Sequence, residues 1–356
     1  MKVKITEVAL AAGVSSATVS KVLSGRTGYA VHAATAERVR QAALHLGYVP
    51  DLAARNLRTG RTGQLGVVLE AVGSSEPDSL LGGVTAGSAV RRTFDGAIMA
   101  GLNDAARELE VPALVVYPGG GKPPASYLDG RVDGLLISCD PLRGHGLLEA
   151  LSGAALPIVA LWTENPPPGM SAVDVDHQAG GALATDHLLG LGHHRVAFYG
   201  GGEASGVEHF RRRELGYRQA MLAAGAPVQT ALHDGALLVE AVRRGEVSAV
   251  FAETDLAAAA VVQALSRAGL SVPGDVSLVG FDDILGAEYI AGGLTTVYHP
   301  AAEMAAEGVH ALMRRLQGES ASQLLLPPHL IVRRSAQTQS ESPVRQEWRL
   351  KRPPKM

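Results

Sequence analysis

From Gln64 onward, short runs of apolar residues alternate with amphipathic stretches, and this alternation constrains the fold more than any other feature of the chain. Seven runs stand out, at residues 65–69, 112–118, 132–139, 157–162, 196–201, 248–253 and 275–282. Such runs are typical of strands buried on both faces, and the stretches between them are typical of crossover helices. The pattern predicts an α/β fold with parallel sheets and helices on both faces.

The length of the chain indicates that this α/β region consists of two parts. The chain has 356 residues, which is more than one hydrophobic core usually serves. Because the strands are also too many for one compact unit, we expect two open α/β halves, with any ligand bound off the carboxyl ends of the strands. Hydrophobic residues make up 46% of the chain and aromatic residues only 4%, so the cores must be mainly aliphatic.

The first fifty residues have a different, helical pattern. The spacing of apolar residues predicts helices over 5–12, 16–23 and 34–46. Gly13 permits a sharp stop after the first helix, and the hydroxyl of Ser15 can cap the second helix by accepting from the amide of Thr18. Two short helices around a tight turn place the second in a DNA major groove in helix-turn-helix proteins, but such pairs also occur in plain bundles.

Charge is distributed unevenly along the chain. Residues 1–63 contain nine Lys or Arg and three acidic residues, a net charge of +6, so the remaining 293 residues carry −9. This asymmetry predicts a polyanionic partner for the N-terminal segment alone, although a merely solvated segment has the same composition. Residues 51–63 are basic and amphipathic and end in a Thr/Gly linker; they are too short for a stable isolated helix, and we expect them to fold on meeting a partner.

The N-terminal sequence closely resembles that of the LacI/GalR family of bacterial transcription regulators. The resemblance rests on ITEVALAAGVSSATVSKVLSG and TAERVRQAALHLGYVPDLAARNLRTGRTGQLGVVL, in fixed order over about 60 residues. It implies a helix-turn-helix domain over 1–50 and a hinge helix with its linker over 51–63. It also implies a homodimer on a pseudo-palindromic operator in double-stranded DNA, because one three-helix unit reads only a half-site.

The resemblance assigns the reading of base edges to Ser16, Ala17 and Lys21 of the second helix. Lys21 would donate to a guanine edge, Ala17 would contact a thymine methyl group, and Ser16 suits several bases. Contacts to the DNA backbone, which position without specifying sequence, are expected from Ser15, Thr18, Ser20, Ser24 and Thr35. For Thr18 the alternative is that it only faces solvent.

In the implied hinge helix, Leu57 matches the leucine that the family wedges between base steps in the minor groove. Ala54, Arg55 and Arg58 flank it and are expected to meet the groove or the DNA backbone. The alternative for Leu57 is packing on the core domain. Lys4 and Asp51 depart from the family pattern, because a Ser or Thr cap and an Asn are more usual at these positions.

Segments further along resemble the family's sensor core, among them AVDVDHQAGGALATDHLLGLGHHRVAFYGG and VFAETDLAAAAVVQALSRAGLSVPGDVSLVGFDDI. That core is similar to periplasmic sugar-binding proteins, which implies two lobes and crossover strands near 171–173, 296–300 and 325–329. The implied core spans 64–338, with lobe 1 over about 64–171 and 299–325 and lobe 2 over about 172–298 and 326–338. A ligand in the cleft would act through its different affinities for two lobe arrangements.

The same resemblance implies six effector contacts, which are Arg213, Asp282, Trp162, His209, Thr254 and Phe94. Arg213 and Asp282 suit bidentate hydrogen bonds to sugar hydroxyls, and Trp162 suits stacking on a sugar face. The alternatives are that Arg213 and Asp282 pair with each other or with helix ends, and that Trp162 only packs within the lobe. Thr254 precedes Asp255, which we expect to cap the following helix.

No pattern in the sequence favours a cofactor, a metal or catalysis. His193, His194 and the DVDH stretch at 174–177 offer metal-ligand types, but LGHHR is typical of a turn between helix and strand, so we predict neither metal nor cofactor. No Ser/His/Asp set stands at a recognisable spacing, so we predict that the protein is not an enzyme. The only cysteine, Cys139, cannot form an internal disulfide.

Targeting signals are also lacking in the sequence. There is no apolar run of about 18 residues, and the N-terminus has no convincing signal peptide, so we expect a cytoplasmic protein without a membrane span. The 71–94 stretch is longer than the family's first strand-to-helix connection and is expected to be a lid or disordered, and the basic tail over 339–356 is expected to be disordered. The tail lacks the Leu heptads that form a tetramer in some relatives.

The function predicted from these features is a sequence-specific transcription regulator, in most relatives a repressor, controlled by a small molecule such as a sugar or sugar derivative. The alternative is a solute-binding protein of a transport system, which the α/β region alone would allow. The basic N-terminal helices argue against that alternative.

Overall fold

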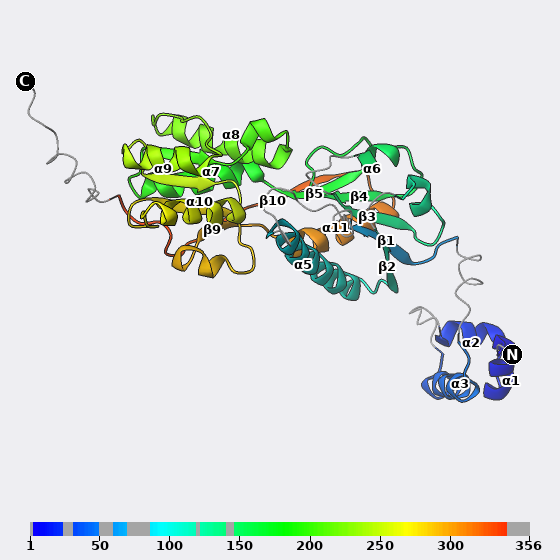
Figure 1. The fold of residues 1–356 in the computed structure, drawn as a ribbon. Coiled ribbons are helices and arrows are strands. Elements are labelled where there is room, and N and C mark those ends of the chain that lie inside the picture. The colour runs from blue at the N-terminus through cyan, green and yellow to red at the C-terminus, as the bar shows by residue number, and fades with distance from the viewer. Residues whose placement is uncertain are drawn as a thin grey trace, which may run out of the picture. The chain divides into compact units, whose positions relative to one another are not determined.

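The computed structural model describes residues 3–23, 31–49, 60–69, 86–118, 122–139 and 146–339 (Figure 1). Contacts within the chain separate two units, of which the first ends at Thr62 and the second begins at Gly63. The hinge residues 51–59, most of the 71–94 stretch and the tail from 340 onward lie outside the described residues.

The N-terminal unit is built from α1 (Ile5–Ala12), α2 (Ser16–Leu23) and α3 (Ala33–Leu46), as the apolar spacing predicted. Gly13 and Gly47 adopt the left-handed conformation just after α1 and α3, where the helix ends need it. Val8, Val19 and Val39, one from each helix, are fully buried in the centre of the unit. Three short amphipathic helices therefore enclose one small aliphatic core.

The second unit contains two sheets, and every strand pair in them is parallel except one. The first sheet has the order β10-β5-β4-β3-β1-β2, from β1 (Gln64–Leu69), β2 (Ala113–Pro118), β3 (Gly134–Ser138), β4 (Ile158–Leu161), β5 (Ser171–Val175) and β10 (Gln323–Leu326). The second has the order β11-β9-β8-β7-β6, from β6 (Val196–Tyr199), β7 (Ala249–Ala252), β8 (Ser277–Asp282), β9 (Thr295–Tyr298) and β11 (His329–Ile331). The last strand, β11, runs antiparallel to β9, which the apolar pattern did not predict.

The chain passes between the sheets three times. It leaves the first sheet after Val175, returns after Tyr298 and leaves again after Leu326. Strand β5 belongs to the first sheet because it pairs with both β4 and β10. The predicted start of lobe 2 at about 172 was therefore a few residues too early.

Helices cover both faces of each sheet (Figure 1). They are α5 (Ala86–Glu108), α6 (Gly146–Ala150), α7 (His177–Gly190), α8 (Glu208–Ala223), α9 (Gly235–Arg243), α10 (Asp255–Arg267) and α11 (Ala301–Leu316), with 3-10 turns η1 (Pro124–Tyr127), η2 (Gly202–Ser205) and η3 (Ala287–Gly292). Helices α7 and α8 lie against one face of the second sheet, and α9 and α10 lie against the other.

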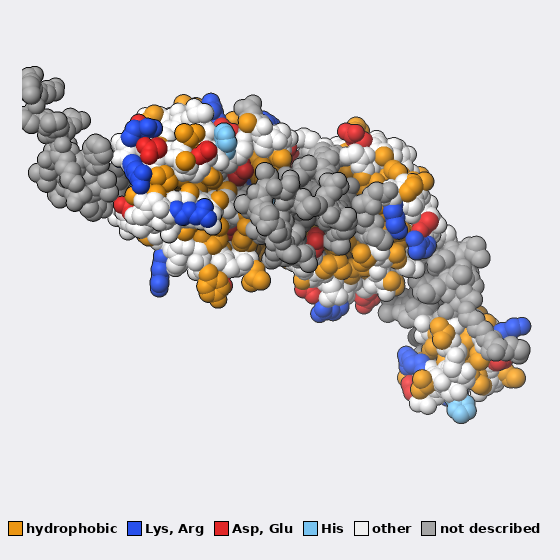
Figure 2. All heavy atoms as spheres, in the orientation of Figure 1, with side chains coloured by type: hydrophobic (Ala, Val, Ile, Leu, Met, Phe, Trp, Pro, Cys, Tyr) orange, Lys and Arg blue, Asp and Glu red, His pale blue; other side chains and the backbone are white. Residues whose placement is uncertain are grey.

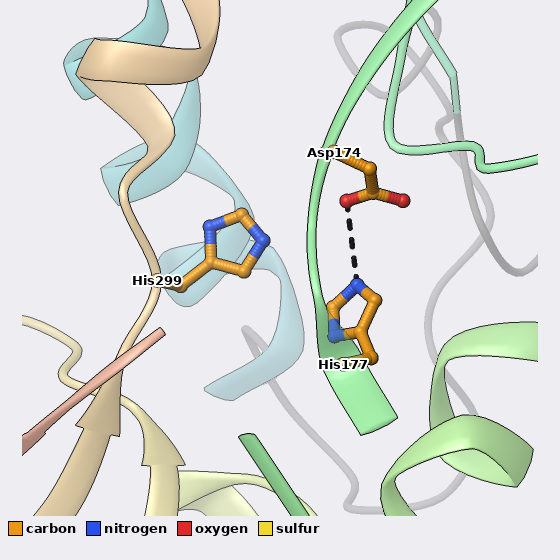
Figure 3. Close-up of side chains that lie close together, drawn as sticks. All are labelled: Asp174, His177 and His299. Carbon is orange, nitrogen blue, oxygen red and sulfur yellow. Dashed lines mark ion pairs between the residues drawn. The ribbon is translucent and has the colours of Figure 1, made fainter. Parts of the chain in front are cut away.

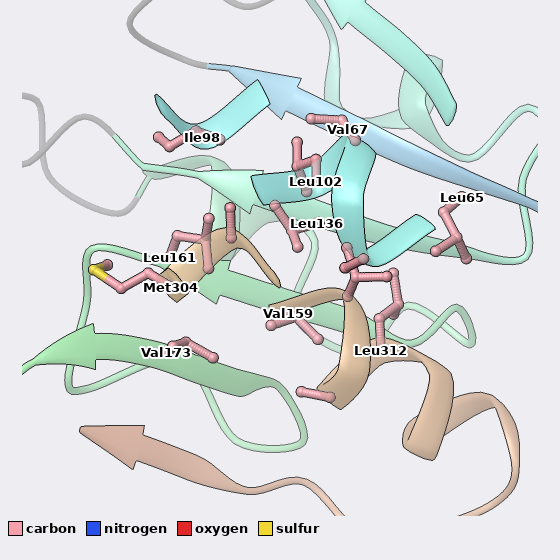
Figure 4. Close-up of a cluster of buried hydrophobic side chains, with 14 of the residues drawn as sticks. Leu65, Val67, Ile98, Leu102, Leu136, Val159, Leu161, Val173, Met304 and Leu312 are labelled. Carbon is pink, nitrogen blue, oxygen red and sulfur yellow. The ribbon is translucent and has the colours of Figure 1, made fainter. Parts of the chain in front are cut away.

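The core of the first sheet lies under α5 and α11 (Figure 4). Leu65 and Val67 of β1 point into this cluster, whereas Val68 points into the cluster on the opposite face, as the alternation of side chains along a strand requires. A side chain at Gly101 of α5 would overlap the backbone of Ala302 in α11. Glycine at this position therefore lets the two helices touch.

The buried side chain of His193 lies in the turn between α7 and β6 that the LGHHR pattern predicted. Its Nε2 lies 2.9 Å from the carbonyl oxygen of Gln337, to which Nε2–H donates, and its Nδ1 lies 3.1 Å from Oγ of Ser248. Burial is the main reason that the pKa of His193 is below its usual value of 6.5. The ring is therefore held neutral, and it ties the C-terminal segment to the second sheet.

Replacing His193 by Gln is expected to flatten the dependence of core stability on pH. On acidification, unfolded chains take up a proton at this imidazole before folded chains do, so its stabilising contribution is full above 6.5 and declines as the pH falls below that value. Urea unfolding between about pH 7.5 and 5.5 measures the slope. The matched control, His194→Gln, changes an exposed neighbour and should keep the wild-type slope.

Candidate functional site

The exposed face of α2 carries the residues predicted to read DNA. Ala17 and Lys21, one helical turn apart, are exposed, and Ser16 is half-buried. Only Val19 of this helix is buried within the unit. Figure 2 shows hydrophobic, basic and acidic side chains exposed on this small unit. The arrangement of α2 fits its predicted docking in a major groove.

The described residues among those predicted to contact phosphates lie just before and within α2 and in the first turn of α3. Ser15 caps α2, because its Oγ accepts from the amide of Thr18 at 3.1 Å, and it also shares a hydrogen bond with the Thr18 hydroxyl at 2.9 Å. Ser20 and Thr35 are half-buried. Ser24 and the hinge residues Ala54, Arg55, Leu57 and Arg58 lie outside the described residues, so their roles stay predictions.

A second group of polar residues lies between the two sheets and centres on Arg213 of α8. The guanidinium is only 3% exposed, and its Nη2 lies 3.1 Å from a carboxylate oxygen of Asp282. It also donates to the carbonyl oxygen of Glu253 and, from Nε, to Nδ1 of His177 at 3.3 Å. The ring of Phe281 lies beneath it, 3.6 Å from the central carbon. Three polar partners and one aromatic ring therefore contact this buried cation.

Two glycines place Arg213 in this position. A side chain at Gly181 of α7 would overlap the backbone of Arg213, and one at Gly216 of α8 would overlap the backbone of Gln178. Because both positions lack a side chain, α7 and α8 approach closely. Arg213 therefore reaches the carboxyl end of β8, where Asp282 lies.

The carboxyl ends of β8 and β4 carry strained backbone at two of the predicted effector contacts. Asp282 ends β8 with φ of 117°, and Trp162 follows β4 with φ of 67°. Conformations of this kind cost about 1–3 kcal/mol and persist where the surroundings impose them, often at ligand sites. Burial raises the pKa of Asp282 to about 6, and the neighbouring Arg213 opposes this rise.

Trp162 joins the first lobe to this group. Its indole stacks on the ring of His299 with centroids 4.2 Å apart, and the ring of Phe94 meets it edge-on at 5.2 Å. The ring of His209 lies 6.3 Å away on the side of the second sheet. The structure thus brings Phe94, Trp162, His209, Arg213 and Asp282 into one group, although Arg213 and Asp282 pair with each other, which was the alternative to a purely ligand-facing role.

Thr254, and not Asp255, caps helix α10. Thr254 is the N-cap of α10 and accepts from the amide of Ala257 at 3.0 Å, so the expectation that Asp255 caps this helix was wrong. Asp255 is instead fully buried and accepts from the hydroxyl of Thr296 and from the amide of Ile284. Thr254 therefore stands at the edge of the group with its hydroxyl engaged in capping.

The structure adds three residues that the resemblance did not assign. Asp174 of β5 lies 3.4 Å from Nε2 of His177 and 3.2 Å from Nε2 of His209, and His299 follows β9. Ligand atoms of Asp174, His177 and His299 all lie within 4.8 Å of one another, a spacing that could hold a metal ion (Figure 3). The DVDH stretch was the only signal of this group in the sequence, because His299 comes from a segment more than a hundred residues away.

Both units match models of known protein families. Residues 4–51 match the family model of bacterial regulatory proteins of the lacI family, and residues 185–336 match that of the periplasmic binding protein-like domain. The chain is 34% identical to the HTH-type transcriptional regulator CelR of Thermobifida fusca, over 92% of this chain and 96% of that protein. It is also 31% identical to the HTH-type transcriptional regulator DegA of Bacillus subtilis (strain 168), over 94% of this chain and 98% of that one.

The chain belongs to the LacI family.

The fold of this LacI-family regulator is also similar to those of solved structures. A complex of the transcriptional regulator CelR with cellobiose has a TM-score of 0.61 and 30% identity, over 94% of this chain and all (100%) of that one. A lac repressor dimer bound to operator and the anti-inducer ONPF has a TM-score of 0.70 at 23% identity, over 95% of this chain and 100% of that one, which shows the shared fold. The DNA-binding unit of the LacI-family chain decides against the transport alternative. No helix in the described part of the chain is long and apolar enough to cross a bilayer.

Proposed function

We propose that this LacI-family transcription regulator is a dimeric repressor that binds a near-palindromic operator. A small carbohydrate bound between the lobes controls its affinity for that operator. The observation that carries the proposal is the group described above. Trp162 belongs to the first lobe, whereas His209, Arg213 and Asp282 belong to the second, so a ligand among them would contact both lobes. Such a ligand has different contacts in open and closed arrangements and therefore shifts the balance between them.

The chemistry of this group suits a carbohydrate. An arginine and a carboxylate offer donors and acceptors for hydroxyl groups, and the indole of Trp162 offers an apolar face for a sugar ring. The relative CelR, whose complex holds cellobiose, supports the same class of ligand. Because the relatives are transcriptional regulators, we infer that the site binds its ligand without turnover. Because the proposed partner is operator DNA, we also infer that the protein acts in the cytoplasm.

Fluorescence anisotropy on palindromic duplexes tests the DNA-binding part of the proposal. We expect a selected operator to bind at least about 10³-fold more tightly than a random duplex, with an affinity that falls steeply between about 50 and 200 mM salt. A thermal-shift panel of sugars and sugar derivatives tests the effector part, because a ligand that prefers the folded state raises its melting temperature. Equal affinity for all duplexes would refute operator reading, and a panel without any stabilising sugar would refute the carbohydrate class.

Replacing Leu57 by Ala is expected to weaken operator binding by roughly 10- to 100-fold, because removing a buried leucine side chain forfeits about 1.5–3 kcal/mol. The fold should not change, and anisotropy with operator and random duplexes measures the effect. Affinity for the random duplex serves as the control and should stay within about twofold, since backbone charge dominates it. Unchanged operator affinity would show that Leu57 is not a wedge.

A further inference from the structure

The three residues Asp174, His177 and His299 form a buried set of donor atoms, which we call the His–Asp cluster. Asp174 and His177 are fully buried, and His299 is only 2% exposed. In Figure 3, the Asp174 carboxylate and the His177 imidazole, from β5 and the start of α7, lie opposite the imidazole of His299. The cluster is therefore assembled from both sheets.

The cluster has polar atoms that the described protein atoms do not satisfy. Both ring nitrogens of His299 and Nε2 of His177 are buried without a hydrogen-bond partner among the described residues, even though Nε2 of His177 lies 3.4 Å from Asp174. An unsatisfied buried donor or acceptor costs about 1–3 kcal/mol. A group that bound these nitrogens would remove that cost, which points to a ligand at this place.

The residue types of the cluster are those that bind zinc in proteins. Burial lowers the pKa of His177 to about 3 and that of His299 well below its usual value, so both imidazoles are neutral. Burial alone would raise the pKa of Asp174, but its interactions with His177 and His209 outweigh burial and hold that pKa below its usual range. Two neutral imidazoles and one carboxylate form a donor set that zinc commonly takes, with an open position for a further ligand.

The charge around the cluster also favours a cation. The side chains of Asp174, Asp282 and Glu253 are all buried, and of these three carboxylates the Arg213 guanidinium forms an ion pair with that of Asp282. Burial raises the pKa values of Asp282 and Glu253, and the nearby Arg213 opposes both rises. A divalent ion would add further positive charge.

We propose that His177, His299 and Asp174 bind a transition-metal ion of the zinc class in the cleft between the lobes. Coordination through Nε2 places the proton of His177 on Nδ1, the atom that now accepts from Nε of Arg213. That hydrogen bond must break when the metal binds. Metal binding is therefore coupled to the position of Arg213, one of the proposed effector contacts, and His209 can remain a hydrogen-bond donor to Asp174.

Titration of the untagged full-length chain, stripped of metal with a chelator, tests this site. We expect calorimetry with ZnCl2 to give one zinc ion per chain, and CoCl2 to give visible absorption bands of a low-symmetry, nitrogen-coordinated cobalt ion that zinc then displaces. His299→Gln and Asp174→Asn should each weaken zinc binding by at least the roughly 10–100-fold that loss of an outer partner costs. The exposed-histidine variant His194→Gln should bind zinc like the wild type.

Three outcomes would overturn the site. Wild-type protein that takes up neither zinc nor cobalt refutes it directly, and this measurement does not depend on any variant folding. Zinc binding that persists unchanged in His299→Gln and Asp174→Asn assigns the metal to surface histidines. Zinc binding that is lost equally in His194→Gln does the same. Circular dichroism, recorded without added metal or sugar, shows whether each variant is folded.

Discussion

Substitution of Val39 by Asp is expected to abolish operator binding while leaving the two-sheet unit folded. Val39 is fully buried (0% exposed) in the small core of the helical unit. A core of this size supplies only about 3–5 kcal/mol, and an unpaired buried carboxylate costs at least as much. Without the folded unit, α2 cannot enter a groove, and the specific component of binding, about 10³-fold or more, is lost.

The matched control for this prediction is Leu44→Asp in the same helix. Leu44 is 82% exposed, so the same chemical change there buries no charge and should leave the unit folded. Anisotropy measures operator affinity, and thermal unfolding of the larger unit, which begins at Gly63, checks that it is intact. If Val39→Asp bound the operator as tightly as Leu44→Asp does, the three-helix unit would not be the DNA reader.

Replacing Arg213 by Met is expected to destabilise the two-sheet unit by about 3–5 kcal/mol, because breaking a buried ion pair leaves its partner charge uncompensated. Asp282 is 8% exposed and loses the guanidinium that lies 3.1 Å from its carboxylate. Urea unfolding followed by the fluorescence of Trp162 measures the loss. The loss should shrink as the pH falls through about 6, where burial already brings Asp282 to take up a proton.

Arg218→Met, further along α8, is the control for Arg213→Met. Its guanidinium lies 3.8 Å from the carboxylate of Glu214 and its side chain is 51% exposed, so the pair should contribute only about 0–1 kcal/mol. Operator binding should survive in both variants, since the DNA-binding unit forms a separate set of contacts. A loss in Arg213→Met no larger than that in Arg218→Met would mean that the Arg213–Asp282 pair does not organise the cleft.

Local sequence patterns predicted the helical unit and most of the strands. Helices α1 and α2 matched the predicted ranges, and the predicted cap is present between Ser15 and Thr18. These features depend on neighbours within one or two turns, so the sequence displays them directly. The strand β11 was not predicted as antiparallel, because its direction depends on where the chain returns after Leu326, and no local pattern encodes that return.

The candidate site was predictable only in part. Resemblance pointed to Arg213, Asp282 and Trp162, and the structure brings them into one group between the sheets. It could not indicate that Arg213 also meets His177, or that Thr254 rather than Asp255 caps α10. Whether a polar side chain caps a helix, binds a ligand or pairs with a charge depends on which segments from elsewhere in the chain surround it.

The amino-acid sequence by itself determined the division into a basic N-terminal helical unit and an α/β unit. Periodicity, helix caps and charge depend on residues that are close together along the chain. Only the tertiary structure decided that Asp174 and His177 lie opposite His299 (Figure 3). The three chain crossings and the close approach of α7 and α8 bring these side chains together. Whether buried imidazoles find partners depends on that packing, because the protein interior offers no water to replace a missing partner.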